Sequence, residues 1–131
     1  MIINQAKQLQ IVRDNGKIHQ EIAHMARELL VAGNTGMTLE TMVREQLARH
    51  RCESAFLGQY GFPAHCIINI NDTVVHGVPD NQVFQDGDVV TFDFGVKREN
   101  LLTDAAFTVV IGGGFPEKQK CIDCANSALK K

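Results

Sequence analysis

Two aspartates lie in segments that otherwise consist of apolar and small side chains. Asp93 lies within VVTFDFGV, Asp104 lies within LLTDAAF, and the polar residues 97–100 separate the two segments. The β-branched and aromatic content of both segments predicts a β-hairpin that turns at this break. A turn centred between Arg98 and Glu99 would place Asp93 directly opposite Asp104, with roughly 5 Å between their Cβ atoms.

Two carboxylates this close on a partly buried sheet repel each other. A shared proton or a bound cation relieves the repulsion, so the pair predicts an acid or metal site. The same register places Thr91 opposite Ala106 and Gly95 opposite Leu102, which leaves room beside the pair. The alternative is an aspartate at a turn or edge in water, and a one-residue bulge would send the two side chains to opposite faces.

The composition bounds the class of protein. With 131 residues, of which 44% are apolar, the chain fits a single domain over residues 1–131. The net charge of −2 gives no electrostatic reason to expect nucleic acid or an anionic membrane as partner. The chain has no apolar run long enough to span a membrane and no secretory signal, so we expect a cytoplasmic protein with reduced cysteines.

The periodicity predicts an α+β fold of two helices, an antiparallel sheet and a last helix. A second helix should begin at Thr38, with its hydroxyl as N-cap, and Pro116 suits the first position of the last helix. The first helix, over residues 5–32, should bury one stripe: Leu9, Val12, Gly16, His19, Ala23, Ala26 and Leu30. Before the hairpin, short strands are expected at 55–57, 66–70 and 73–75.

The last helix carries Cys121 and Cys124, which have the spacing of half a zinc site or of a redox pair. No second pair of closely spaced ligands accompanies them, so packing on a helix face is the favoured interpretation. The apolar pattern of this helix then stops at residue 131 without a closing glycine or asparagine, which leaves open that the chain is truncated.

His76 is the third candidate for chemistry, because it is expected at the end of an apolar strand just before a turn. An imidazole there faces a cleft and can donate a hydrogen bond, move a proton or ligate a metal at neutral pH. A packing or turn role is the alternative. His65 ranks lower, as a loop residue for which the sequence suggests no partner.

The chain resembles type I methionine aminopeptidases of the pita-bread fold. The resemblance rests on LGQYGFP at 57–63, INDTVVHGVP at 70–79, DGDVVTFD at 86–93 and TDAAFTV at 103–109, in order and with matching spacing. It covers essentially the whole chain but only the N-terminal half of such an enzyme. The implied fold is therefore the N-terminal half of a pita-bread domain.

The resemblance also implies a site with two divalent metal ions, such as Co, Mn, Fe or Zn. Asp93 would be a metal ligand and Asp104 would bridge the two ions. His76 would contact the substrate near the scissile bond, and Phe62 would line the pocket for the methionine side chain. The implied reaction is metal-dependent hydrolysis that removes the N-terminal methionine from peptides and nascent proteins.

The chain ends before the histidine and two glutamates that complete the site in this family. We therefore expect that activity needs a complementary C-terminal half. The alternatives are a catalytically inactive peptide-binding module of the same fold and a non-functional remnant. A binding module has no need of two repelling carboxylates, so the intact aspartate pair favours the enzyme.

Overall fold

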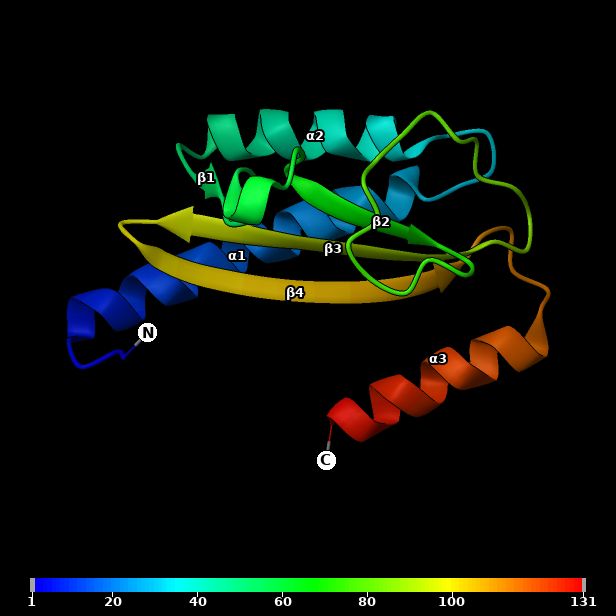
Figure 1. Ribbon diagram of the computed structural model, residues 1–131. Helices are drawn as coiled ribbons and strands as arrows, with labels where there is room; N and C mark the ends of the chain where they lie inside the picture. The colour runs from blue at the N-terminus through cyan, green and yellow to red at the C-terminus, as the bar shows by residue number, and fades with distance from the viewer. Residues whose placement is uncertain (1, 131) are drawn as a thin grey trace.

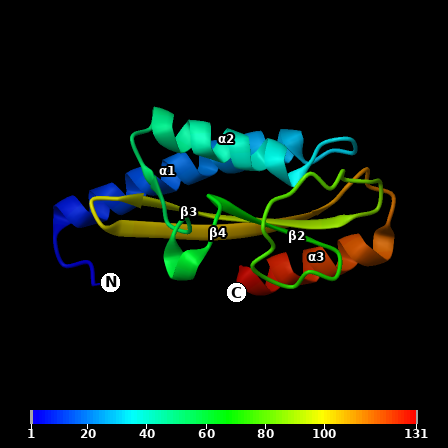
Figure 2. The ribbon, with the colours of Figure 1, turned by 45° about the horizontal axis from the view of Figure 1, so that its top comes forward.

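The computed structural model describes residues 2–130 and shows three helices and a four-stranded antiparallel sheet (Figure 1). Two helices cover one face of the sheet, and the third follows the last strand (Figure 2). This arrangement confirms the expected α+β architecture. The elements are α1 (Ala6–Leu29), α2 (Gly36–Arg49), β1 (Glu53–Ser54), β2 (Cys66–Ile70), β3 (Val89–Arg98), β4 (Leu101–Val110) and α3 (Pro116–Leu129).

Strand β3 is the centre of the sheet and is paired along both edges. Strand β4 takes one edge, whereas β1 and β2 share the other edge end to end. Ser54 of β1 lies opposite Val96 and Cys66 of β2 lies opposite Phe94, so Gly95 falls between the two pairings. Residues 55–65 therefore leave the sheet and rejoin it at the same point along β3.

The β3–β4 hairpin turns one residue later than predicted. Its turn residues Glu99 and Asn100 have positive φ values of 49° and 62°, as a tight two-residue hairpin turn requires. Asp104 therefore lies opposite Gly95 and Asp93 lies opposite Ala106, so the predicted direct opposition of the aspartates is wrong by two positions. Because this shift is even, both carboxylates stay on one face as diagonal neighbours, with Cβ atoms roughly 7 Å apart.

The neighbours predicted for the aspartate pair change with the register. Thr91 lies opposite Thr108 rather than Ala106, and the two hydroxyls share a hydrogen bond of 2.8 Å. Gly95 lies opposite Asp104 rather than Leu102, so the smallest residue of β3 faces one of the carboxylates. The room beside the pair is therefore present, although different residues provide it.

The core lies between the sheet and helices α1 and α2. Alternate residues of β3 point into it and are at most 1% exposed: Val90, Phe92, Phe94 and Val96. Phe107 of β4 is partly buried against the same cluster. Burial of each such large apolar side chain stabilises the fold by about 1.5–3 kcal/mol. The core therefore fixes the position of β3, whose other face carries Asp93.

Helix α1 buries a slightly different stripe from the predicted one. Its later half agrees, since His19 and Ala26 are buried, but Leu9 is 42% exposed and Gly16 is exposed. In its earlier half the buried positions include Asn15, whose amide donates a hydrogen bond of 3.1 Å to the Leu101 carbonyl. Apolar periodicity could not identify a buried position that is held by a hydrogen bond.

Three local predictions are wrong. Helix α2 is capped by Thr35, whose side chain accepts from the Thr38 amide at 3.3 Å, so the helix begins before Thr38. Residues 55–57 and 73–75 do not form strands, and Val74 and Val75 are 84% and 62% exposed. Residues 71–76 instead form a loop that returns to the outer edge of β2, where the Gly77 carbonyl accepts from the Ile68 amide, and the chain leaves the sheet after the Ala55 amide donates to the Gly95 carbonyl.

Helix α3 begins at Pro116, as predicted, but buries none of its residues 116–129. Cys121 and Cys124 are exposed thiols, so the expected helix-face packing is wrong within the described chain. The last strand and α3 are joined through Gly112, Gly113 and Gly114, all with positive φ. No helix among residues 2–130 is both long and apolar enough to cross a bilayer.

His19 joins α1 to the β3–β4 hairpin, and a substitution at this residue measures how much the contact stabilises the fold. Its Nε2 donates to the Phe94 carbonyl at 2.8 Å, and its Nδ1 lies 3.2 Å from the Thr103 hydroxyl. Burial lowers the pKa of His19, although the charge of Asp104 opposes this, so the neutral ring suits the site. We expect His19→Ala to lower the free energy of unfolding by about 2 kcal/mol in urea denaturation.

The matched control is His24→Ala, which removes an exposed histidine from the same helix. Its effect should stay within about 0.5 kcal/mol. Equal effects of the two variants would show that the contacts of His19 with the hairpin add no stability, since both substitutions change helix propensity in the same way.

Candidate metal and substrate site

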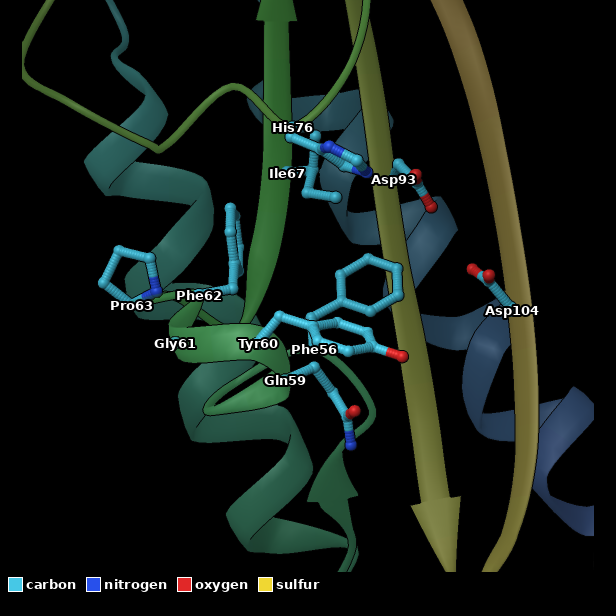
Figure 3. Close-up of a pocket in the computed structure, with 10 residues that line it drawn as sticks. All are labelled: Phe56, Gln59, Tyr60, Gly61, Phe62, Pro63, Ile67, His76, Asp93 and Asp104. Atoms are coloured by element: carbon cyan, nitrogen blue, oxygen red, sulfur yellow. The ribbon is translucent and has the colours of Figure 1, made fainter.

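A cavity of about 510 Å³ opens on the sheet face opposite α1 and α2 (Figure 3). All four residues singled out from the sequence line it: Phe62, His76, Asp93 and Asp104. They come from four separate parts of the chain, namely the segment after β1, the loop after β2, and strands β3 and β4. The other lining residues are Phe56, Gln59, Tyr60, Gly61, Pro63 and Ile67.

The two carboxylates point towards each other across neighbouring strands (Figure 3). Burial and then the negative charge of Asp104 raise the pKa of Asp93 from 3.8 to about 6, and nearby His76 acts in the opposite direction. Without a counter-ion, the ionised pair is therefore unfavourable at neutral pH. A cation between the carboxylates would remove the repulsion.

The donor chemistry fits a divalent cation in part. Carboxylate oxygens suit hard ions such as Mn²⁺, and borderline ions such as Co²⁺ and Zn²⁺ accept them together with imidazole. Within residues 2–130, however, no three or more His, Cys, Asp or Glu side chains gather closely enough to hold an ion. The described residues thus offer two carboxylates at this cavity, fewer than the ligands that such an ion ordinarily takes.

His76 reaches the cavity from a loop and not from a strand end, so that part of the prediction is wrong. It has a φ of 58°, and its ring points towards Asp93 (Figure 3). The next residue, Gly77, fastens the loop to β2: its amide donates to Asn69 Oδ1 at 2.9 Å, and its carbonyl accepts from the Ile68 amide at 3.0 Å. A backbone contact therefore places the imidazole.

Sequence reasoning singled out Phe62 but missed the other two aromatic residues of the cavity wall. Phe56 and Tyr60 line the cavity together with Phe62, and Ile67 of β2 lies beside them (Figure 3). The sequence did carry a signal for this wall. Residues 56–62 contain three aromatic side chains and two glycines, a composition that is atypical of a β-strand. Gly95 makes room for this wall, since a Cβ there would lie 2.5 Å from the Cβ of Ala55.

Comparisons with known proteins identify the family. Residues 10–131 match the profile described as metallopeptidase family M24. The chain belongs to this family. A methionine aminopeptidase from Aquifex aeolicus is 34% identical over 130 residues, covering 94% of this chain and 50% of the relative. One from Clostridium perfringens is 33% identical and covers 100% of this chain and 53% of the relative.

The chain thus spans about half the length of the curated M24 relatives that it matches. The crystal structure of methionine aminopeptidase from Thermotoga maritima superposes with a TM-score of 0.94 at 27% identity, over 99% of this chain and 53% of that one. A prolidase from Pyrococcus furiosus, at 20% identity and a TM-score of 0.77, covers 91% of this chain and 34% of its own, and shows the fold alone.

These M24 relatives confirm two expectations from the sequence. The resemblance to methionine aminopeptidases holds over nearly the whole chain, and the fold is the N-terminal half of the pita-bread fold. A metallopeptidase family also implies the use of divalent metal, which agrees with the carboxylate pair.

Because the pKa of Asp93 is raised, we predict that Asp93→Asn increases the free energy of unfolding of the metal-free chain, and that this increase depends on pH. The folded state holds the Asp93 proton more tightly than the unfolded state does, so ionisation costs stability as the pH rises from about 4 through 6. The neutral amide of the variant would avoid this cost. Two pKa steps correspond to at most about 2.7 kcal/mol, and solvent screening of this half-buried group reduces the expected gain to about 1 kcal/mol.

The measurement is urea denaturation in chelator at pH 7.5 and at pH 3.5. The gain should be present at pH 7.5 and nearly absent at pH 3.5, where Asp93 is mostly protonated in both states. Asp72→Asn, at an exposed loop position, serves as control and should show no gain. Destabilisation by Asp93→Asn at pH 7.5 would contradict an unfavourable carboxylate pair.

Because the Gly77 backbone lies very close to β2, we predict that a methyl group added at this position lowers the stability of the fold. A Cβ at Gly77 would lie 2.1 Å from the Ile68 carbonyl oxygen, which is backbone and cannot yield. We expect Gly77→Ala to destabilise the chain by about 1–3 kcal/mol and to shift the NMR signals of His76. Gly16→Ala, in the open middle of α1, should stabilise it by about 0.5–1 kcal/mol. A change in stability of the same sign in both variants would refute the view that Gly77 is needed to hold the His76 loop against β2.

Proposed function

We propose that this chain is the N-terminal, metal-binding part of a methionine aminopeptidase, which hydrolyses the N-terminal methionine from peptides and nascent proteins. The observation that carries the proposal is the meeting of Asp93, Asp104, His76 and Phe62 in one cavity, which are the residues that the resemblance to methionine aminopeptidases assigns to the site. Because the chain spans about half of those relatives, activity requires a complementary C-terminal half.

The cavity wall suits the substrate side chain. Phe56, Phe62 and Ile67 form an apolar surface next to the carboxylates. An unbranched thioether side chain makes favourable contacts with aromatic rings, so methionine fits this wall. Its amino group and first peptide bond would then lie towards Asp93 and His76.

The polar residues of the cavity have separable roles in this proposal. Asp93 and Asp104 would hold the divalent ions. When bound, such ions polarise a carbonyl and lower the pKa of a water molecule. His76 donates a hydrogen bond to the carbonyl oxygen of the first peptide bond, where negative charge develops during attack. The complementary half contributes the further ligands and closes the cavity against solvent.

The identity of the ions and the location of the protein are part of the proposal. Co, Mn, Fe and Zn all accept a carboxylate-rich set of ligands. The net charge of −2 supports neither nucleic acid nor a membrane as partner. We place the protein in the cytoplasm, where nascent chains present their initiator methionine.

A peptide-binding module without catalysis is the second candidate. It is favoured by one observation, that within residues 2–130 only two carboxylates come together at the cavity and no larger group of ligands forms. Such a module would bind an N-terminal methionine against the aromatic wall and would not depend on metal.

Metal binding separates the two candidates and gives a testable prediction. Calorimetry with Mn²⁺ should detect binding to the purified chain, and Asp93→Asn or Asp104→Asn should weaken it by at least about tenfold, since each removes a charged ligand. Asp72→Asn should bind as the wild type does. Absence of binding heat in the wild type would favour the peptide-binding module.

Activity is tested with a separately expressed C-terminal half of the Aquifex aeolicus relative, and a Met-Ala-Ser peptide as substrate. Methionine release is expected only from the mixture, and Asp104→Asn should reduce it by about a hundredfold or more. Robust release by the chain alone would refute the need for a second half. Full activity of Asp104→Asn in the mixture would contradict the assignment of Asp104 to the metal site.

A further inference from the structure

One short segment supplies most of the cavity wall. Residues 56–63 contribute six of the ten lining residues: Phe56, Gln59, Tyr60, Gly61, Phe62 and Pro63. Apart from the 3-10 turn Gln59–Gly61, the segment has no regular structure. Its hydrogen bonds between Gly58 and Phe62 and between Gln59 and Phe62 lie within the segment. They give it a shape but do not attach it to the sheet.

The start of the segment is attached through Ser54, the last residue of β1. The Ser54 hydroxyl accepts from the amides of Phe56 at 3.0 Å and Leu57 at 3.1 Å. It also donates to the His65 carbonyl at 3.1 Å, on the far side of the segment. One hydroxyl therefore joins the two ends of the excursion that leaves and rejoins the sheet beside Gly95.

The end of the segment is attached through Glu40 of α2. Its carboxylate accepts from the His65 amide at 3.0 Å, from His65 Nδ1 at 2.6 Å and from the Cys66 amide at 3.2 Å. The Glu40 side chain is 13% exposed, and hydrogen bonds to a shielded carboxylate are stronger than neutral ones. His65, for which the sequence suggested no partner, thus belongs to this anchor.

The anchor itself has no nucleophile. Cys66 lies within reach of Glu40, with its Sγ 3.4 Å from Oε2, but it is fully buried. Burial and the Glu40 charge both raise the pKa of its thiol, so the thiol stays protonated and acts as a weak donor. Glu40, His65 and Cys66 therefore form a structural cluster behind the wall and not a second reactive site.

We propose that Glu40 is a positioning residue for the substrate pocket, which sets the place of Phe62 and Tyr60 by holding His65 and Cys66 at the end of the segment. Pro63 and Ala64 alone separate Phe62 from the anchored residues, so a shift at the anchor moves the wall. The functional meaning of this wall rests on the proposed function. The mechanical part, that Glu40 immobilises the segment, does not.

The chain offers a specific reporter for this mechanical part. Tyr60 is the single tyrosine of a chain without tryptophan, and its side chain is fully exposed, so its anisotropy follows the motion of the segment rather than a packing contact of its ring. Glu40→Gln keeps the size of the side chain but loses the charge and one acceptor. We expect lower anisotropy of Tyr60 in Glu40→Gln, with an unchanged far-UV circular dichroism spectrum. Glu45→Gln, exposed on the same helix, should leave the anisotropy unchanged.

Ligand titrations then separate positioning from general damage. In Glu40→Gln, the dissociation constant for methionine amide should rise about tenfold, whereas that for Mn²⁺ should stay within about twofold. If the wild type binds no methionine amide, the proposed function fails, while the anisotropy still decides the role of Glu40. Unchanged anisotropy in a folded Glu40→Gln overturns the proposal.

A measurement on the wild type covers the case in which the variant does not fold. The amides of His65 and Cys66 should exchange with deuterium much more slowly than the Asp72 amide, which lies in an exposed turn. Exchange of His65 and Cys66 as fast as that of Asp72 would show that the Glu40 anchor is open in solution and would overturn the proposal.

Discussion

The antiparallel ladder between β3 and β4 is the interaction on which the rest of this structure depends. Its one face carries Val90, Phe92 and Phe94 into the core, and its other face carries Asp93 and Asp104 into the cavity. Since side chains alternate along a strand, the packing that holds β3 against the helices also aims the carboxylates outwards. Stability and site geometry thus come from the same ten residue pairs of the hairpin.

The carboxylate pair costs stability that the core must offset. Burial and the charge of Asp104 raise the pKa of Asp93 to about 6, so the ionised pair is unfavourable in the metal-free fold. The buried side chains of β3 each contribute about 1.5–3 kcal/mol, enough to carry a cost near 1 kcal/mol. The fold can therefore keep an unfavourable carboxylate pair without unfolding. Proteins commonly tolerate such local costs at functional sites, because the rest of the structure offsets them.

The loops that line the cavity attach to the sheet in a different way. The segment at 56–63 projects between two strands that share one edge, and Gly95 is the residue left between their pairings. The loop that carries His76 is fastened to β2 through Gly77. Both attachments depend on a missing Cβ, because a side chain at either glycine would meet its neighbours at 2.5 Å or less. The loops that form the cavity can therefore lie this close to the sheet only because glycine occupies both contact positions.

The sequence by itself determined the α+β class, the hairpin and the shared face of Asp93 and Asp104, because alternation and turn residues are local signals that survive an even shift in register. Tertiary structure decided the rest. Glu40 meets His65 across 25 residues, and the loop that carries His76 is held in place by the contacts of Gly77 with Asn69 and Ile68 of β2. Such contacts depend on which edges and donors the folded chain leaves free, and no local pattern encodes that.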